Sequence, residues 1–402
     1  MSKLFSPYQI GSLTLRNRIV VSPMSQHMAS GGMPGVWHGA HLSQFALGGA
    51  GLVFVEATAV SADAIQCVDD LGIWSDEHGA AFAPIVDQVH ACGAHIGLQL
   101  GHAGRKAGTS PFWKENRPLT PSEMEEHDAS WHRMSASSIS VGKGWSAPRA
   151  LDLSDIVRIK GQFRDAARRA RNAGFDVLEL HFAHGYLVAS FLSPLTNHRS
   201  DSYGGSFDGR IRLALEIVAE VRQEWPTERP LFCRISAVDG SAEGGWNMED
   251  SVRFSQALIA AGVDIIDCSS GGIGQSPTQA SRGLGFQVPY AEQIKREAQV
   301  PVVAVGYILG PQQAEAVVAE GRADAVAIGR AALFDPYWPL HAARELLGDV
   351  RALELWPQPY AKWLTAWSQR LEENGTSAQL SIQGPGELRP QQAADDVSRK
   401  LA

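Results

Sequence analysis

Three polar side chains that lie close together in the sequence could act on one small polar group. His181, His184 and Tyr186 follow the run 176–180, whose apolar alternation predicts a buried strand ending at the first histidine. Two imidazoles can donate hydrogen bonds to a carbonyl oxygen or bind an anion, and a phenol can act as an acid. Histidines spaced three apart also occur in ordinary loops and in metal sites, so the motif alone leaves these roles open.

The strand that carries these residues belongs to a regular alternation of short apolar runs and helical stretches. Predicted strands occupy residues 18–22, 51–57, 95–100, 177–181, 231–236, 264–269, 301–306 and 325–329. Predicted helices occupy residues 39–47, 77–92, 153–173, 210–224, 249–261, 290–298 and 311–319, with a last helix at 336–347. Eight strands separated by helices favour parallel pairing and close a (β/α)8 barrel. We therefore predict an α/β fold, a TIM barrel forming one domain over residues 1–370.

Three stretches break this alternation. Residues 1–16 hold two brief alternating runs around Gly11, which predict a capping hairpin at the start of the chain. Residues 103–150 separate the third strand from its helix by far more than an ordinary connection, and such a loop is expected over the active-site face of a barrel. A C-terminal extension ends in the polar tail 371–402, which we expect to be mobile or to rest on a neighbour.

The composition limits the partners that this chain could have. Of its 402 residues, 44% are hydrophobic and 19% are charged, which indicates a soluble globular protein. We find neither an apolar leader at residues 1–11 nor a run of about 18 apolar residues, so we expect a cytoplasmic protein without a membrane partner. A net charge of -8 without a basic cluster argues against nucleic acid. The widely spaced cysteines are predicted to be free thiols: Cys67, Cys92, Cys233 and Cys268.

The ends of the later strands could hold a phosphate. In a barrel the chemistry lies at the C-terminal ends of the strands, and phosphate is commonly bound after the seventh and eighth. Gly306 and the pair Gly329 and Arg330 stand at those two positions. Loop amides and a forked guanidinium could bind the phosphate oxygens there, although either glycine alone would suit a turn.

Two polar residues within the predicted strands could face a cofactor. Arg234 lies in an apolar strand, where its charge needs an anionic partner. That partner could be an Asp or Glu side chain, or a cofactor that becomes negatively charged. The amide of Gln99 can donate and accept together, which matches the edge of a heterocycle and equally suits a hydrogen bond within the core.

Metal and hydrolase chemistry are less well supported by these residues. Glu56 is the only carboxylate that we place at a strand end, and His181 and His184 lack a third ligand for a closed zinc shell. A GxSxG nucleophile elbow is absent from the sequence. A phosphate-bearing cofactor opposite two histidines and a tyrosine therefore fits better than a hydrolase site.

Several motifs in the same order along the chain resemble the Old Yellow Enzyme flavoproteins, and the thermophilic-like branch with its xenobiotic reductases is the most similar. The similarity runs from about residue 4 to residue 370. It is carried by SPM at 22–24, GIWSD at 72–76, QLGHAGRK at 99–106, HFAHGY at 181–186, NHR at 197–199 and DSYGGS at 201–206.

This resemblance implies an FMN-dependent ene-reductase. Such an enzyme reduces activated C=C bonds in enones, enals and nitro compounds with NADPH or NADH by a ping-pong mechanism, and its FMN is held tightly without a covalent bond. Among the residues that would bind it, Arg234 would balance the charge of the reduced flavin. The others would line the flavin ring (Ser22, Pro23, Met24, Ser25, Ala57 and Gln99) or hold the phosphate (Gly306, Gly329 and Arg330).

The resemblance also assigns the histidines and the tyrosine. His181 and His184 would hydrogen-bond the electron-withdrawing group of the alkene, hydride would pass from the flavin to the β-carbon, and Tyr186 would supply a proton to the α-carbon. The nicotinamide nucleotide would bind transiently in the same pocket, consistent with the absence of a Rossmann GxGxxG motif. The branch further implies a homodimer or homotetramer.

Three positions depart from the branch or need separate comment. Ser25 replaces its usual cysteine, so we expect a flavin potential different from that of cysteine-bearing relatives; equal potentials in wild type and Ser25→Cys would refute this. His27 replaces a tyrosine, which puts the substrate contact at this position in question. Trp363 lies in a segment similar to one whose tryptophan enters an active site, and a packed hydrophobic anchor is the alternative.

Two other functions are kept as alternatives to the reductase. A metal-dependent barrel aldolase or hydrolase would use His181 and His184 as ligands, and a flavin absorption band without bound zinc would separate it from the reductase. A non-catalytic barrel would bind FMN yet fail to oxidise NADPH when an enone is present.

Overall fold

The computed structural model describes residues 2–127, 131–240, 243–274 and 282–374. Within them, eight parallel strands form a closed barrel in which each strand pairs with the next one along the chain. The last strand pairs with the first, with Val326 opposite Ile19. The barrel strands are β3 (Ile19–Val21), β4 (Leu52–Ala59), β5 (His95–Gly101), β8 (Val177–Phe182), β9 (Leu231–Ser236), β10 (Ile265–Ser269), β11 (Val302–Ala304) and β12 (Ala325–Ile328). The predicted (β/α)8 barrel is confirmed.

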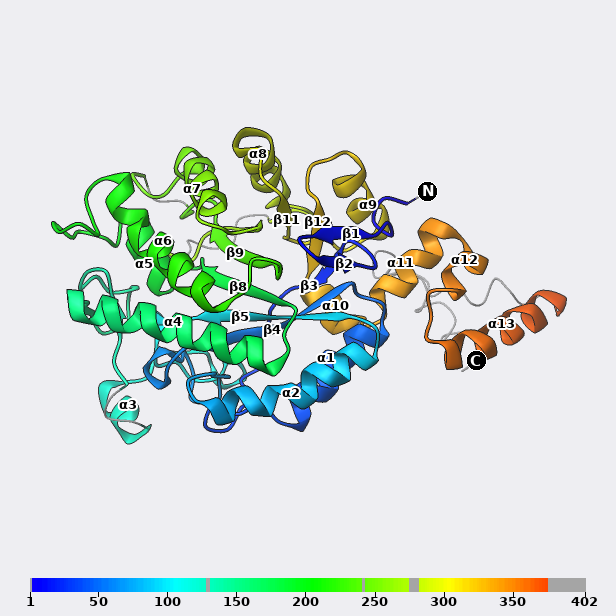
Figure 1. Ribbon diagram of the computed structural model, residues 1–402, viewed down its shortest axis with the longest axis horizontal. Coiled ribbons are helices and arrows are strands. Elements are labelled where there is room, and N and C mark those ends of the chain that lie inside the picture. Colours follow the sequence, from blue (N-terminus) through cyan, green and yellow to red (C-terminus); the bar gives the residue numbers. More distant parts are fainter. Residues whose placement is uncertain (1, 128–130, 241–242, 275–281, 375–402) are drawn as a thin grey trace, which may run out of the picture.

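Helices cover the outside of this barrel (Figure 1). They are α1 (Val36–Leu47), α2 (Asp76–Ala91), α4 (Leu153–Ala173), α6 (Phe207–Glu224), α7 (Met248–Ala260), α8 (Val288–Ala298), α9 (Pro311–Ala319) and α11 (Trp338–Leu347). Helix α4 shows why they form where predicted. The Asp152 side chain accepts the N–H of Asp155 at its start, Gly174 takes the left-handed φ of 93° at its end, and its buried face includes Ile159 and Phe163.

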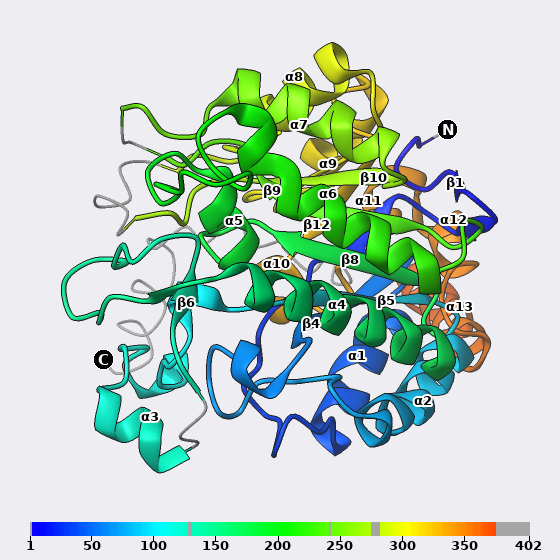
Figure 2. The same cartoon turned by 60° about the vertical axis from the view of Figure 1, so that its left-hand side comes forward.

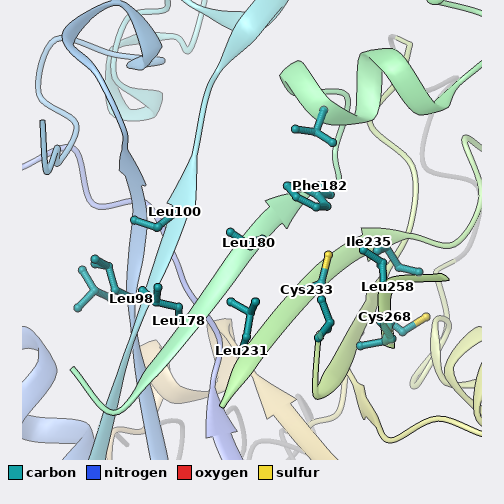
Figure 3. Close-up of a cluster of buried hydrophobic side chains, with 14 of the residues drawn as sticks. Leu98, Leu100, Leu178, Leu180, Phe182, Leu231, Cys233, Ile235, Leu258 and Cys268 are labelled. Carbon is teal, nitrogen blue, oxygen red and sulfur yellow. The ribbon is translucent and has the colours of Figure 1, made fainter. Parts of the chain in front are cut away.

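Alternate residues of the strands face opposite sides of the barrel wall. Figure 3 shows apolar side chains of β5, β8, β9 and β10, among them Leu178, Leu180, Cys233 and Ile235, packed in one buried cluster with Leu258 of α7. The residues between them in sequence therefore face the barrel interior. Burying the outer row stabilises the wall by roughly 1.5–3 kcal/mol per large side chain.

The capping hairpin is also present. Strands β1 (Tyr8–Ile10) and β2 (Leu13–Leu15) pair antiparallel, with Tyr8 opposite Leu15. Ile10 and Leu15 are buried in a separate cluster with the first inward residues of the barrel strands, which include Val177, Phe232 and Ile265. The hairpin thus closes the end of the barrel at which the strands begin.

The excursion after β5 lies at the other end. It contains the short helix α3 (Pro121–His127) and strands β6 (Met134–Ser135) and β7 (Arg149–Ala150). The Arg133 guanidinium folds it by donating to the carbonyl oxygens of Ala107, Gly108 and Leu119 at 2.9 Å each. Figure 2 shows α3 and β6 on the same side as α5 (Leu187–Leu192), the helix that follows the histidine motif.

Some expectations need correction. The helix over 336–347 was expected to be the last, which is wrong, because α12 (Asp349–Leu353) and α13 (Gln358–Glu373) follow it. The short helices α5 and α10 (Arg330–Phe334) were not predicted. Of the tail, residues 375–402 lie outside the described part of the chain, so its expected mobility and the domain boundary at 370 stay predictions.

Two further expectations concern the cysteines and membrane spans. All four cysteines are free; Cys92 is half-buried and the other three are buried. Among the described helices, none combines the length and the apolar character needed to cross a bilayer.

Candidate active site

The two histidines form a hydrogen-bonded chain at the end of β8. His181 Nδ1 lies 3.3 Å from the Ala183 backbone N–H, which can only donate, so the proton of this ring belongs on Nε2. That Nε2 lies 3.3 Å from Nδ1 of His184, whose own Nε2 lies 2.7 Å from Ser269 Oγ on β10. The chain of bonds therefore joins the ends of two strands, with the proton positions assigned from the hydrogen-bond network.

A tight turn holds this arrangement. His184 has a φ of 60° and Gly185 one of 72°, in the left-handed region. The His184 N–H donates to Ser236 Oγ at 2.9 Å, which ties the turn to β9. A Cβ on Gly185 would overlap the carbonyl oxygen of Gly272, and one on Gly272 would overlap the His184 backbone. Two glycines therefore let the loops after β8 and β10 touch.

Both imidazoles are neutral at physiological pH. Burial, together with the nearby cations Arg234 and Lys106, lowers the pKa of His181 to about 3. Burial and the same cations lower the pKa of His184 well below its ordinary value. Each ring therefore offers one N–H donor and no charge, which suits a carbonyl or nitro oxygen better than it suits an anion.

Tyr186 lies against the first histidine. Its ring is 4.9 Å from that of His181 in an edge-on arrangement, and its hydroxyl donates to Gln66 Oε1 at 2.6 Å. Burial, with the charge of Asp70, raises the pKa of the phenol, so Tyr186 stays protonated at neutral pH and can act as an acid. Lys106 Nζ lies 5.6 Å from the centre of this ring and donates to the His184 carbonyl at 2.6 Å.

The barrel interior beneath the histidines carries charge. Arg234 Nη1 lies 2.7 Å from Ser22 Oγ and 3.3 Å from Asp267 Oδ2, while Gln99 Nε2 donates to Glu179 Oε1 at 2.6 Å. Arg234 therefore has an Asp side chain as its anionic partner, and Gln99 makes a hydrogen bond within the core, as the alternatives to a cofactor contact required. Burial raises the pKa of Glu179 well above its ordinary value and also raises that of Asp267, so this acidic pair resists a second negative charge.

Glu179 and Asp267 lie in the middle of β8 and β10, so they add two buried carboxylates to Glu56, the one expected at a strand end. They also leave buried atoms without hydrogen-bond partners within the described residues: Arg234 Nε, Glu179 Oε2 and Asp267 Oδ1. A buried guanidinium N–H that lacks a partner is costly and points to a further acceptor. The polar edge of a flavin, which accepts and becomes anionic on reduction, is such an acceptor, so the residues present fit this group.

The loop after β3 lies next to these residues. Glu56 Oε2 accepts the Gln26 N–H at 2.6 Å and so holds the loop that contains Ser22, Pro23, Met24 and Ser25. One cavity is lined by Ser25 of this loop, Ala57 of β4, and His181 and Tyr186. Two predicted flavin-ring residues and two predicted substrate residues therefore share one cavity wall.

The three predicted phosphate residues also lie together. Gly306 is buried at a φ of 113° after β11, and the guanidinium of Arg330 lies 4.9 Å from the ring centre of the adjacent Tyr307. A Cβ on Gly329 would lie 3.5 Å from Met24 Sδ. The end of β12 therefore adjoins the loop after β3, which carries four of the predicted flavin-ring residues.

His27 lies beside the cavity in a charged pair. Its Nδ1 is 2.5 Å from Asp70 Oδ1, and its ring packs edge-on against Phe112 and Trp113 of the excursion. Burial alone would lower the pKa of His27, but hydrogen bonds to Asp70 and Cys67 outweigh it and raise the pKa to about 10. His27 is therefore an imidazolium at neutral pH. Its predicted contact with substrate stays a prediction.

This pair predicts a loss of stability at alkaline pH. The unfolded His27 has a pKa of about 6.5, so the pair stabilises the fold fully below that pH and less as pH rises through about 10. Between pH 6 and pH 10, the free energy of unfolding of wild type should fall by about 1–3 kcal/mol more than that of His27→Gln. Urea denaturation of both proteins across this range measures the difference. Parallel curves would show that the pair is not charged.

Two groups of side chains among the described residues are close enough to bind a metal ion, and neither includes His181 or His184. They are His27, Cys67 and Asp70, and the barrel-bottom set His90, His95 and Asp176. In each set the carboxylate already accepts hydrogen bonds from a histidine and from at least one backbone N–H group. The metal-dependent alternative therefore has no third ligand beside its two histidines among the described residues.

One predicted site residue, Trp363, lies away from His181, His184 and Tyr186. It lies on α13 with 78% of its surface exposed. Figure 1 shows α13 at the end of the molecule opposite α3. The side chain is therefore not a packed anchor within the described chain, and its place in a substrate pocket stays a prediction.

The sequence reasoning missed several residues of this site. Gln66 and Asp70 lie in the loop before the GIWSD motif and carried no recognised pattern. Lys106 ends the QLGHAGRK motif, which was recognised without a role for its lysine. The inward alternation of Glu179 with Leu178 and Leu180 was a usable signal, because a buried strand with a carboxylate must pair that carboxylate.

Comparisons with known proteins agree with this geometry. A profile of the NADH:flavin oxidoreductase / NADH oxidase family matches residues 3–348. The chain is 42% identical over 351 residues to an NADPH dehydrogenase of Geobacillus thermodenitrificans, covering 87% of this chain and 96% of the relative. It is 40% identical over 353 residues to an NADPH dehydrogenase of Bacillus subtilis, covering 87% and 97%.

Solved structures are similar over most of their length. Morphinone reductase in complex with tetrahydroNAD superimposes with a TM-score of 0.69 at 28% identity, covering 87% of this chain and 92% of that one. The Old Yellow Enzyme homologue from Zymomonas mobilis superimposes with a TM-score of 0.69 at 25% identity, covering 89% and 98%.

Proposed function

The chain belongs to the NADH:flavin oxidoreductase / NADH oxidase family, the Old Yellow Enzyme flavoproteins, and on that premise we propose that it is an ene-reductase for activated C=C bonds. It is an FMN-dependent NAD(P)H oxidoreductase. The observation that carries the finer proposal is the cavity that His181 and Tyr186 share with Ser25 and Ala57. A neutral histidine and a protonated phenol beside the loop proposed to bind flavin support this function.

The residues proposed to hold FMN fall into two groups. Arg234 offers its unpaired Nε–H to the polar edge of the flavin ring, beside Gln99 and the loop Ser22–Ser25. Gly306, Gly329 and Arg330 bind the phosphate. When bound, FMN takes a hydride from NAD(P)H and supplies it to the alkene.

The histidines would bind and polarise the electron-withdrawing group of the alkene. His181 donates from Nε2, because its Nδ1 accepts the Ala183 N–H. In the structure His184 Nδ1 accepts from His181, so it can donate to the alkene only after the substrate oxygen takes over the His181 N–H and the Ser269 hydroxyl donates to His184 Nε2. Two hydrogen bonds to a carbonyl or nitro oxygen withdraw electron density from the β-carbon and so favour hydride addition there.

Tyr186 would complete the reduction as the acid. Its phenol is protonated at neutral pH and lines the same cavity as His181. Proton delivery to the α-carbon then gives the saturated product. Because the cavity serves both the nicotinamide nucleotide and the alkene in turn, a ping-pong order follows.

One stopped-flow experiment tests this function. The enzyme is reduced anaerobically with NADPH or with NADH and then mixed with 2-cyclohexenone, with cyclohexanone as the control. We expect rapid return of the flavin absorption and saturated ketone only with the enone. Reduction without faster reoxidation by any enone, enal or nitroalkene would favour the non-catalytic FMN-binding barrel instead.

The assembly state is a separate proposal. The resemblance to the thermophilic-like branch supports a homodimer or homotetramer, and light scattering on the purified holoenzyme measures it. A monomer would refute it.

A further inference from the structure

The proton of Tyr186 is held by a residue to which neither the motifs nor the family comparison assigns a role. The Tyr186 hydroxyl donates to Gln66 Oε1 at 2.6 Å, although the two residues are 120 positions apart in the sequence. Gln66 also lines the cavity that holds His181 and Tyr186. The proposed acid and this amide therefore meet at the wall of the proposed substrate pocket.

The segment that carries Gln66 is held from several sides. The N–H groups of Gln66 and Cys67 both donate to Asp70 Oδ2, at 2.9 Å and 2.8 Å, and Asp70 Oδ1 pairs with His27. The Gln66 carbonyl accepts the Thr109 N–H at 2.8 Å from the excursion. The amide is thus presented to Tyr186 by a fixed backbone.

We propose that Gln66 is the positioning residue for Tyr186, with an amide that serves both protonation states of the phenol. In the resting enzyme its oxygen accepts from the hydroxyl. After Tyr186 delivers its proton, the amide turns over and its Nε2–H donates to the phenolate oxygen. This inference rests on the proposed ene-reductase function.

The proton transfer is balanced by simple exchanges. The O–H bond of Tyr186 breaks as a C–H bond forms at the α-carbon, after hydride from the bound reduced cofactor has reached the β-carbon. Solvent water then returns a proton to the phenolate, and the amide turns back to accept. The amide itself is neither protonated nor consumed.

The surroundings of Tyr186 make such an amide useful. Burial and the carboxylate of Asp70 both oppose a phenolate, and the adjacent rings of His181 and His184 are neutral. Lys106, 5.6 Å from the ring centre, is the cation that faces the phenol. A neutral donor at the hydroxyl adds stabilisation where the phenolate charge develops, while the same group orients the proton beforehand.

Two substitutions separate this role from simple packing. Gln66→Leu keeps much of the volume and removes both polar atoms, so we expect reoxidation by 2-cyclohexenone to slow roughly 10-fold with NADPH reduction unchanged. Gln66→Glu introduces a carboxyl that can donate only while protonated. Its reoxidation rate should therefore fall as pH rises through the pKa of that carboxyl, whereas wild type and Gln66→Leu show no such step.

A direct measurement tests the contact without turnover. Tyrosine labelled with ¹³C at Cζ reports the hydrogen bond of the phenol, and the Tyr186 signal is assigned as the one lost in Tyr186→Phe. In the holoenzyme we expect Gln66→Leu to shift this signal. Asp69→Asn, a change in the same loop, serves as the control and should leave it in place.

The outcomes separate the two proposals. If wild type reduces the enone but Gln66→Leu matches it in rate and in the Tyr186 signal, the positioning role is refuted and the reductase stands. The same holds if Gln66→Glu lacks the pH step. If wild type reduces no activated alkene, both proposals fall together.

Discussion

Tyr186→Phe should slow the reoxidation of the reduced enzyme by 2-cyclohexenone by about 100-fold or more and leave its reduction by NADPH within about 2-fold of wild type. The phenylalanine keeps the ring contact with His181 but lacks the hydroxyl that lies 2.6 Å from Gln66. Hydride transfer from the nucleotide requires no acid, whereas completion of the alkene reduction does. The two half-reactions should therefore respond differently to the same change.

Stopped-flow absorbance of the flavin measures both rates. Tyr203→Phe is a matched control, because the Tyr203 hydroxyl bonds to Glu216 at 2.9 Å outside this cavity. That variant should keep both rates. If Tyr186→Phe slows reduction instead of reoxidation, the phenol acts on nucleotide binding and is not the proton donor.

Arg234→Met should weaken both the fold and the binding of FMN. The guanidinium lies 3.3 Å from Asp267, and the two side chains are only 9% and 4% exposed. Removing one member of a buried ion pair typically costs about 3–5 kcal/mol, because the other charge is left unpaired. FMN affinity should fall roughly 10- to 100-fold with the loss of a charge-assisted hydrogen bond.

The pH dependence of this variant has a definite sign. Burial already raises the pKa of Asp267, and Arg234 opposes that rise. Without the arginine the folded-state pKa moves further above the unfolded value of about 3.9, so the lost stability is small near pH 4 and grows as pH rises.

Urea denaturation of apo-protein and FMN fluorescence titration measure the two effects. Arg296→Met is the matched control, because the Arg296 side chain is 64% exposed, and it should change neither quantity. An Arg234→Met protein with wild-type affinity for FMN would remove Arg234 from the proposed flavin site.

The barrel could be predicted from the sequence because its wall has a strong pattern. Each strand is a short apolar run, and a long amphipathic stretch follows it as a helix. Helix α4 also has capping residues at both ends. Helices α5 and α10 could not be found this way, because 6 and 5 residues are too few for a helical period to appear.

The site residues could likewise be predicted only in part. Residues at strand ends, such as His181 and Arg234, could be placed because the barrel itself brings strand ends together. Glu179 and Asp267 were missed because they lie within their strands, whereas the prediction rested on the residues at the strand ends. The contact between Gln66 and Tyr186 depends on loop conformation, for which a single sequence holds no local signal.

The contact between Gly185 and Gly272 limits how this pocket can be altered. Because a side chain on Gly185 would overlap Gly272, and one on Gly272 would overlap the His184 backbone, the turn of His184 is set partly by a loop from another strand. Engineering that widens the loop after β10 would move the histidine as well. The excursion around Phe112 and Trp113 is freer to vary, because both rings are half exposed and neither contacts this turn of the loop after β8.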